Sequence, residues 1–133
     1  MALILVVDGE EDLAGSLTQA LHEQGYEAEA ITDPISAYAY LRKQVPDLVV
    51  LDLMTAPPPG EESQPDGLKL LAQLSLDHPR VPIVIWSRSS GYRDLFWSWA
   101  AAAHIEKGED LGPVLKVVRE LLGGPVATDQ VTA

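Results

Sequence analysis

The stretch LILVVDGEEDL, residues 3–13, joins a continuous apolar run to a group of acidic residues. An uninterrupted apolar run as short as Leu3 to Val7 is typical of a strand that is covered on both faces in a parallel sheet. Asp8 follows directly at the end of this run, and Glu10 and Glu11 come soon after it. A buried strand that ends in carboxylates predicts an α/β fold with chemistry at a strand end.

The same alternation continues along the whole chain. Further strand-like segments lie at 27–31, 48–51 and 81–86, and a short one lies near 104–105. Helical spacing separates them at 11–24, 34–43, 68–76 and 92–103, and a last helix places apolar residues on one face at Leu111, Val114, Leu115, Val118, Leu121 and Leu122. Five strands and five helices in alternation predict a doubly wound parallel sheet with helices on both faces.

Length and composition limit the organisation of the chain. With 133 residues it is expected to form one domain over residues 1–122, followed by a flexible tail at 123–133. The segment TAPPPGEESQP, within residues 54–66, has neither helical nor strand periodicity and is expected to be an exposed loop. No apolar run reaches the ~18 residues that a membrane span needs, and we expect a cytoplasmic protein.

Residue types exclude several classes of site. The chain has no cysteine, so disulfides and thiolate catalysis are absent, and its three histidines are scattered without the spacing of a zinc site. The formal net charge of −11 repels nucleic acid and anionic membranes, so direct binding to either is not expected. The simpler interpretation, that the acidic surface only keeps the protein in solution, stays open.

Polar residues follow four of the predicted strands. They are Asp8 after the first, Asp52 after the third, Ser87 after the fourth and Lys107 after the fifth. The carboxyl ends of parallel strands meet at one edge of a sheet, so these groups should surround one crevice. Each alone has a plain explanation as a cap, a loop hydroxyl or a surface charge. Together, carboxylates, a hydroxyl and an ammonium predict a Mg²⁺-assisted phosphoryl site with Asp52 as the nucleophile.

The segments LILVVDGEEDL, PDLVVLDLM, the pair Asp66-Gly67, VPIVIWSRS and HIEKG occur in the order of the motifs of response-regulator receiver domains. The chain resembles this family over residues 2–122. The resemblance implies the flavodoxin-like strand order 2-1-3-4-5 and phosphorylation of Asp52 by a histidine kinase or phosphotransfer protein. It also implies that Asp8, Asp52 and the backbone carbonyl of Met54 hold Mg²⁺. Lys107 would then contact the phosphate, and Ser87 would couple phosphorylation to a change of shape.

The chain departs from the family pattern at several positions. Gly9 stands where a second acidic ligand is usual, and Glu10 could substitute for it or the metal site could be lost. Gly108 replaces the usual proline after Lys107, His104 replaces the usual aromatic residue, and the loop at 54–66 is longer than usual. This loop could be a lid or a partner contact, or a tolerated surface insertion.

An aromatic group, Tyr92, Phe96, Trp97 and Trp99, precedes the last helix. Trp97 and Trp99 are two residues apart and cannot share one helical face, which favours a partner surface that includes the last helix. A homodimer would be one use of this surface.

Three functions are compatible with these patterns. The first is a stand-alone phosphoacceptor switch that signals through a protein contact and is not an enzyme in its own right. The second is a pseudo-receiver that binds partners without phosphorylation. The third is a small phosphohydrolase in which Asp8 and Glu10 form the acidic pair; the absence of an obvious substrate cap counts against it.

Overall fold

The structure of the chain, a computed structural model, describes residues 1–53, 66–88 and 100–123. Within these ranges five strands form one parallel sheet in the order β2-β1-β3-β4-β5, as predicted. The strands are β1 (Leu3–Val7), β2 (Glu27–Ile31), β3 (Leu48–Leu51), β4 (Ile83–Ser87) and β5 (Ala103–Glu106).

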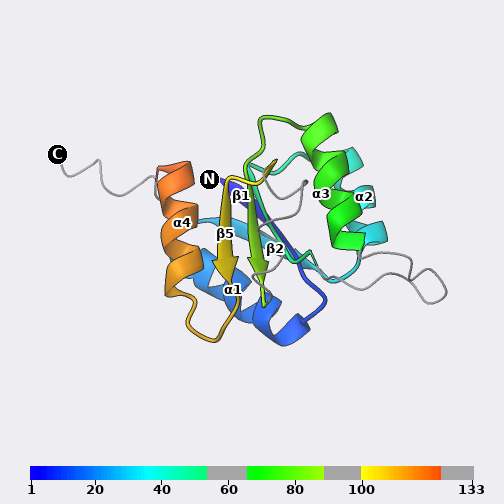
Figure 1. Ribbon diagram of the computed structural model, residues 1–133. Helices are drawn as coiled ribbons and strands as arrows, with labels where there is room; N and C mark the ends of the chain where they lie inside the picture. Colours follow the sequence, from blue (N-terminus) through cyan, green and yellow to red (C-terminus); the bar gives the residue numbers. More distant parts are fainter. Residues whose placement is uncertain (54–65, 89–99, 124–133) are drawn as a thin grey trace.

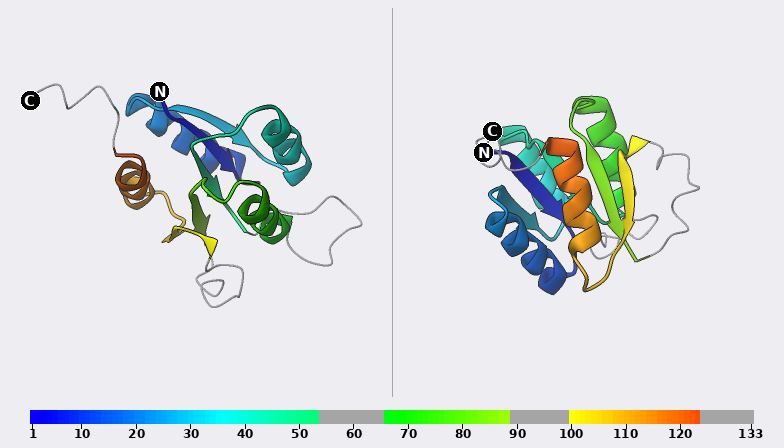
Figure 2. Two further views of the ribbon diagram at one scale, coloured as in Figure 1. Left: turned by 90° about the horizontal axis from the view of Figure 1, so that it is seen from above. Right: turned by 90° about the vertical axis from the view of Figure 1, so that its left-hand side faces the viewer.

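The described helices cover both faces of this sheet. They are α1 (Glu11–Glu23), α2 (Pro34–Lys43), α3 (Asp66–Asp77) and α4 (Gly112–Leu122). Helices α1 and α4 lie on one face, and α2 and α3 lie on the other (Figures 1 and 2). Each pair closes its own apolar core against the sheet. The predicted α/β class with a doubly wound sheet is therefore confirmed.

The position of each strand in the sheet explains its composition. The central strands β1, β3 and β4 are covered on both faces, and β3 and β4 are buried along their whole length. Such strands read as continuous apolar runs because neither face meets water. The edge strands β2 and β5 are more exposed, and their sequences EAEAI and AHIE accordingly contain charged residues.

Several helix ends follow from local chemistry. Asp33 caps α2 by accepting a hydrogen bond from Ser36 N at 2.7 Å, and Pro34 occupies the first turn, where its missing N–H costs nothing. Gly25, after α1, has φ 95°, and Gly123, at the end of α4, has φ 80°. Both values lie in the left-handed region that glycine adopts without steric strain.

Three predicted boundaries are corrected. Strand β4 begins at Ile83, not Val81, and α3 runs from Asp66 to Asp77, longer than the predicted 68–76. The predicted helix at 92–103 does not extend over its last residues. Ala102 N donates to Ile83 O at 2.8 Å, so the chain already pairs with β4 there, and Ala103 begins β5. Alanine has a high helix propensity, but this tertiary pairing overrides it.

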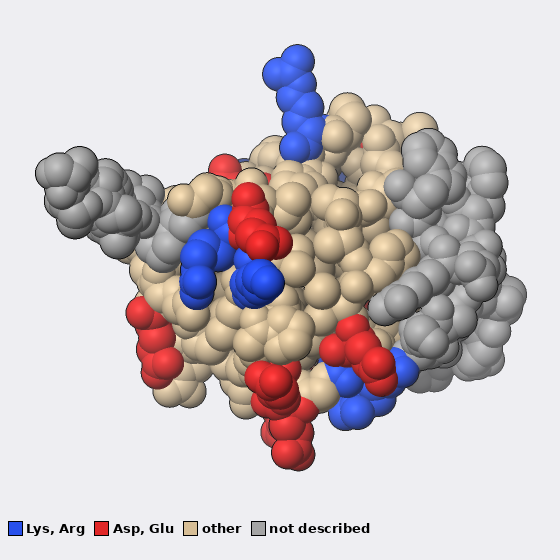
Figure 3. Space-filling view, turned by 60° about the vertical axis from the view of Figure 1, so that its left-hand side comes forward, with Lys and Arg blue, Asp and Glu red and all other residues tan. Residues whose placement is uncertain are grey.

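Other predictions fall outside the described residues. These are residues 54–65 of the loop predicted at 54–66, the predicted metal-ligating carbonyl of Met54, the aromatic group Tyr92, Phe96, Trp97 and Trp99, and residues 124–133 of the tail predicted at 123–133. The last residue of the predicted loop, Asp66, is instead the first residue of α3. None of the helices in the described part of the chain has the length and apolar composition that a membrane span requires. On the face that Figure 3 brings forward, which carries α4, basic side chains lie next to acidic ones and not in a continuous basic surface.

Gly67 fixes how closely α3 approaches the end of β3. It is buried in the first turn of the helix, and a Cβ atom built there would overlap the backbone oxygen of Asp52 and lie 2.7 Å from Leu53 Cα. Both of these neighbours are backbone atoms that cannot rotate away. Only a residue without a side chain allows this contact between the helix and the segment that carries Asp52.

We predict that Gly67→Ala lowers the free energy of unfolding by about 1–3 kcal/mol, because the methyl group forces the backbone apart. Gly15→Ala is the matched control, since Gly15 is exposed within α1 and an added Cβ meets nothing within 4 Å. The free energy of unfolding of Gly15→Ala should rise by about 0.5–1 kcal/mol, because alanine has a higher helix propensity than glycine. Urea denaturation of the two variants beside the parent chain measures both effects. Equal effects of the two substitutions would contradict the proposed role of Gly67.

Candidate functional site

The predicted site residues meet at the carboxyl edge of the sheet. Backbone hydrogen bonds between neighbouring strands continue to these positions, from Asp8 N to Ile31 O at 3.0 Å, from Asp52 N to Val7 O at 3.0 Å and from Lys107 N to Ser87 O at 2.8 Å. The hydrogen bonds between the strands therefore set the backbone positions of these residues.

Burial separates these residues from the other polar residues. Within the described ranges, the buried polar or charged residues are Asp8, Asp52, Ser87 and Lys107, each between 1% and 7% exposed. Charged residues are rarely buried unless they are paired. These four buried residues are those that the strand-end argument selected.

The ammonium group of Lys107 joins the acidic residues of the site. Its Nζ donates to Asp52 Oδ2 at 2.8 Å and to Glu10 Oε2 at 2.9 Å, and it lies 2.6 Å from Asp8 Oδ2. The Lys107 side chain is fully buried. One cation thus holds three carboxylates together, and negative charge remains in excess.

Two further features orient Lys107. Its Nζ lies 5.3 Å from the centre of the buried Trp86 ring, which is within the range of a cation–π interaction. The Lys107–Gly108 peptide bond is trans. The position of the Lys107 ammonium group is set by contacts with other elements, namely the carboxylates and Trp86.

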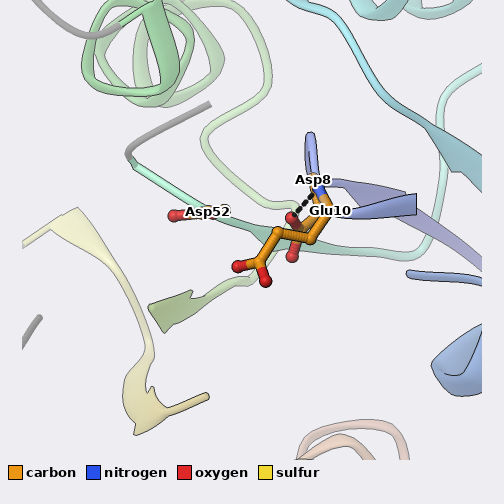
Figure 4. A group of neighbouring side chains, drawn as sticks. All are labelled: Asp8, Glu10 and Asp52. Carbon is orange, nitrogen blue, oxygen red and sulfur yellow. Dashed lines mark hydrogen bonds between the residues drawn. The ribbon is translucent and has the colours of Figure 1, made fainter. Parts of the chain in front are cut away.

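Glu10 brings a third carboxylate to the site from the turn after β1. Oxygen atoms of Asp8, Glu10 and Asp52 lie within 4.8 Å of one another (Figure 4). The backbone N–H of Glu10 donates to Asp8 Oδ1 at 2.8 Å, which closes the turn so that the Glu10 side chain reaches the other two acids (Figure 4). The predicted ability of Glu10 to reach the site past Gly9 is thus seen in the geometry.

Arg88 completes the arrangement, and the sequence analysis did not select it. Its Nε and Nη2 donate to both carboxylate oxygens of Glu10, with the shortest distance 2.8 Å. Both side chains of this pair are partly exposed, 61% for Arg88 and 40% for Glu10. The sequence feature that could have identified Arg88 is its position directly after Ser87, at the end of a strand. An arginine at such a position is ordinarily a solvated surface residue.

Burial and charge shift several pKa values in this cluster. Burial raises the pKa of Asp8, and its contacts with Lys107 and with the Glu10 N–H offset only part of this effect. Hydrogen bonds from Arg88 and Lys107 lower the pKa of Glu10 to about 2. For Lys107, burial acts to lower the pKa, but hydrogen bonds to Asp52, Asp8 and Glu10 outweigh it and the pKa is raised. Glu10 and Lys107 are therefore charged at neutral pH.

The cluster has the donor set of a site for a hard cation. Its ligand atoms are carboxylate oxygens, which Mg²⁺ and Ca²⁺ prefer. Asp8 Oδ2 is buried and has no directed hydrogen bond within the described residues, although it lies in ion-pair contact with Lys107. Gly9 adds no ligand, but a Cβ atom there would meet only Thr32 O at 3.8 Å, an ordinary contact. The residues present fit a divalent cation.

We predict that Lys107→Met lowers the free energy of unfolding by about 3–5 kcal/mol at neutral pH, because buried carboxylates lose their cation. The loss should shrink as the pH falls towards 5. Without the ammonium the folded-state pKa of Asp8, which burial already raises, rises further, and a carboxyl group with a raised pKa costs stability as the pH rises through that value. Urea denaturation at pH 5 and pH 8 measures the change, with the exposed Lys116→Met as control. An equal loss at both pH values would contradict this account.

Comparison with known sequences supports the assignment that the geometry favours. The family model described as response regulator receiver domain matches residues 4–119. The nitrogen assimilation regulatory protein NtrX of Azorhizobium caulinodans is 36% identical over 84 residues, which are 63% of this chain and 17% of that protein. Regulatory protein VanRc of Enterococcus gallinarum is 36% identical over 75 residues, 56% of this chain and 29% of that protein. The chain therefore matches only a minor part of these relatives.

Solved structures give the same result over nearly the whole fold. The response regulator TrrA of Thermotoga maritima, in complex with Mg²⁺ and BeF, is 27% identical with a TM-score of 0.78, covering 91% of this chain and 99% of TrrA. TrrA in complex with the histidine kinase ThkA is 29% identical with the same TM-score, covering 92% of this chain and 99% of the matched chain. Sequence, fold and the acidic cluster agree: this chain belongs to the response regulator receiver domains, the phosphoacceptor signalling modules of two-component systems.

Proposed function

We propose that this chain accepts a phosphoryl group on Asp52 from a histidine kinase or phosphotransfer protein. The observation that carries the proposal is the contact between Asp52 Oδ2 and the buried ammonium of Lys107 at 2.8 Å, inside a cluster of three carboxylates. A buried lysine beside an aspartate at a strand end supplies both an acceptor and a cation for the incoming phosphoryl oxygens. The likeness to TrrA, which was crystallised with a histidine kinase, supports the choice of donor.

In the proposed reaction, a carboxylate oxygen of Asp52 attacks the phosphorus atom of the donor. The bond between phosphorus and the donor atom breaks, and the donor keeps the electron pair. Lys107 keeps its proton, because its pKa is raised, and offsets charge on the phosphoryl oxygens. Ser87, buried at the end of β4, donates a hydrogen bond to one of these oxygens and links the phosphorylated state to the backbone of β4. The product is an acyl phosphate.

The metal in this proposal is Mg²⁺, held by Asp8, Asp52 and Glu10 together with the backbone carbonyl of Met54. When bound, Mg²⁺ would neutralise charge on the transferring phosphoryl group. Support comes from the carboxylate oxygens within 4.8 Å of one another, from the buried Asp8 Oδ2 and from the Mg²⁺ in the TrrA crystal. Because Gly9 adds no carboxylate, the proposed site binds Mg²⁺ less tightly than a site with the usual acidic pair. The carboxylate of Glu10 compensates for part of this loss of affinity.

The partners of the phosphorylated state are part of the same proposal. The receiver unit spans residues 1–122, acts in the cytoplasm and signals through a protein contact or a homodimer. The surface for this contact would combine α4 with Tyr92, Phe96, Trp97 and Trp99. The −11 net charge disfavours nucleic acid as the direct partner.

A second function is favoured by a specific observation. Both oxygens of Glu10 are already paired with Arg88 and Lys107, and Lys107 also contacts Asp8 and Asp52. Two cations of the chain therefore stabilise the acidic cluster. A pseudo-receiver that binds its partner without phosphorylation could use the same arrangement as a fixed structural element.

We predict that acetyl phosphate with Mg²⁺ adds one phosphoryl group to the chain, because Asp52 and Lys107 form the acceptor site. Intact mass measured with Mg²⁺ and with EDTA tests this directly. Asp52→Asn should abolish the addition. Asp47→Asn is the matched control. Asp47 lies at the amino-terminal ends of the strands, away from the site, where it accepts a hydrogen bond from Leu3 N.

The outcomes of this experiment separate the two functions. A Mg²⁺-dependent addition that requires Asp52 supports the phosphoacceptor. No addition from acetyl phosphate, and none from several histidine kinases, would favour the pseudo-receiver. Addition that survives Asp52→Asn would show that the acceptor is a different residue.

We predict that Gly9→Asp tightens Mg²⁺ binding by at least about tenfold. The structure has room for a side chain at position 9, and one more carboxylate about 4 Å from a dication is worth roughly 2 kcal/mol even at the dielectric constant of water. Isothermal titration calorimetry with MgCl₂ measures the affinity. Gly9→Asn, with the same shape and no charge, is the control. Unchanged affinity in the aspartate variant would mean that position 9 does not face the metal.

A further inference from the structure

Glu10 has a cation on each of two sides. Lys107 Nζ donates to its Oε2 at 2.9 Å from inside the site. From the solvent side, Arg88 Nη2 donates to Oε1 at 2.8 Å, and Arg88 Nε lies 3.1 Å from Oε2 and 3.3 Å from Oε1. A guanidinium group that engages both oxygens of one carboxylate makes a directional contact. Neither oxygen of Glu10 is thus open to a new ligand unless an existing bond is given up.

The two cations differ in how readily they can leave. The Lys107 side chain is fully buried and is held by Asp52 and Asp8 as well as Glu10. The Arg88 side chain is 61% exposed, and its Nε and Nη2 both donate to Glu10. Exposed ion pairs are weak, since water and salt compete for both partners. Arg88 is therefore the cation that can move away at low cost.

We propose that Arg88 is a positioning residue that competes with the divalent cation for Glu10, so that the Glu10–Arg88 pair acts as a latch on the metal site. This inference rests on the proposed function, since it concerns the metal of the same site. With the latch closed, Glu10 is held near Asp8 and Asp52 but its oxygens are occupied. With the latch open, Glu10 gives the site the third carboxylate that Gly9 does not provide. The affinity of the site for the metal then depends on two things. One is the number of carboxylates, and the other is how readily Glu10 exchanges Arg88 for the metal ion.

Mg²⁺ titration of the unphosphorylated full chain tests the latch, with no phosphodonor present. Arg88→Ala should tighten Mg²⁺ binding by about threefold to tenfold, because Glu10 no longer has to leave a guanidinium group. Arg119→Ala is the matched control: Arg119 is an exposed arginine of α4 that donates to Gln24 and contacts no acid of the site. It should leave the affinity unchanged. Far-UV circular dichroism confirms that each variant is folded.

A second pair of variants separates the latch from a general effect of charge. In a Glu10→Gln background, Arg88→Ala should lose most of its effect, because the residue for which Arg88 competes is gone. Arg88→Lys keeps the charge but not the two-pronged contact, and it should show part of the gain. An equal gain in both backgrounds, an unchanged or weaker affinity in Arg88→Ala, or no Mg²⁺ binding by any variant would each overturn the latch.

The failure of the latch and the failure of the proposed function give different results. Phosphorylation of Asp52 with no effect of Arg88→Ala on Mg²⁺ affinity would remove the latch and leave the phosphoacceptor. Tighter Mg²⁺ binding in Arg88→Ala, lost in the Glu10→Gln background, would support the latch even if Asp52 accepted no phosphate.

Discussion

The ammonium group of Lys107 lies at the centre of the interactions on which this site depends. Asp8, Glu10 and Asp52 come from two separate segments of the chain, and their carboxylates lie within 4.8 Å of one another. Like charges at that separation repel, and burial adds a further cost for Asp8 and Asp52. Contacts of Lys107 with all three acids, at 2.6 to 2.9 Å, offset this repulsion. Because the charge is only partly compensated, the cluster stays attractive to a further cation.

The sheet makes this arrangement possible by fixing where each charge begins. β1, β3 and β4 are central strands packed on both faces, and their ends can shift little without disturbing two apolar cores. Gly67 adds a second constraint, because α3 contacts the backbone of Asp52 and Leu53 where no Cβ atom fits. The segment that carries Asp52 is thus held from the neighbouring strand and from the following helix. Rigid placement of the acidic and basic groups favours an electrostatic role, since little reorganisation is needed when the charge of the site changes.

The sequence predicted most of the fold and the inner part of the site for identifiable reasons. Strands buried on both faces produce continuous apolar runs, and in a parallel sheet the residues after those runs share one edge, so Asp8, Asp52, Ser87 and Lys107 could be selected. The end of the predicted helix at 92–103 was wrong, since the alanines at 102 and 103 pair with β4 against their propensity. Arg88 and Trp86 were not selected for the site. Their roles come from side-chain reach across strands, which periodicity does not encode.

Gly9 shows how one departure from a family pattern can be compensated by neighbouring residues. Glycine at that position would remove a ligand from the proposed metal site, but it also adds no further negative charge for Lys107 to offset. The side chain of Glu10 points towards the site. The backbone N–H of Glu10 donates to Asp8, and Arg88 contacts the Glu10 carboxylate from the solvent side. This carboxylate is on a longer and partly exposed side chain, so it can exchange partners where an aspartate fixed at position 9 could not. In the proposed metal site, glycine at position 9 would therefore replace a fixed ligand with a movable one, and the charge of the site would respond to the groups that compete for Glu10.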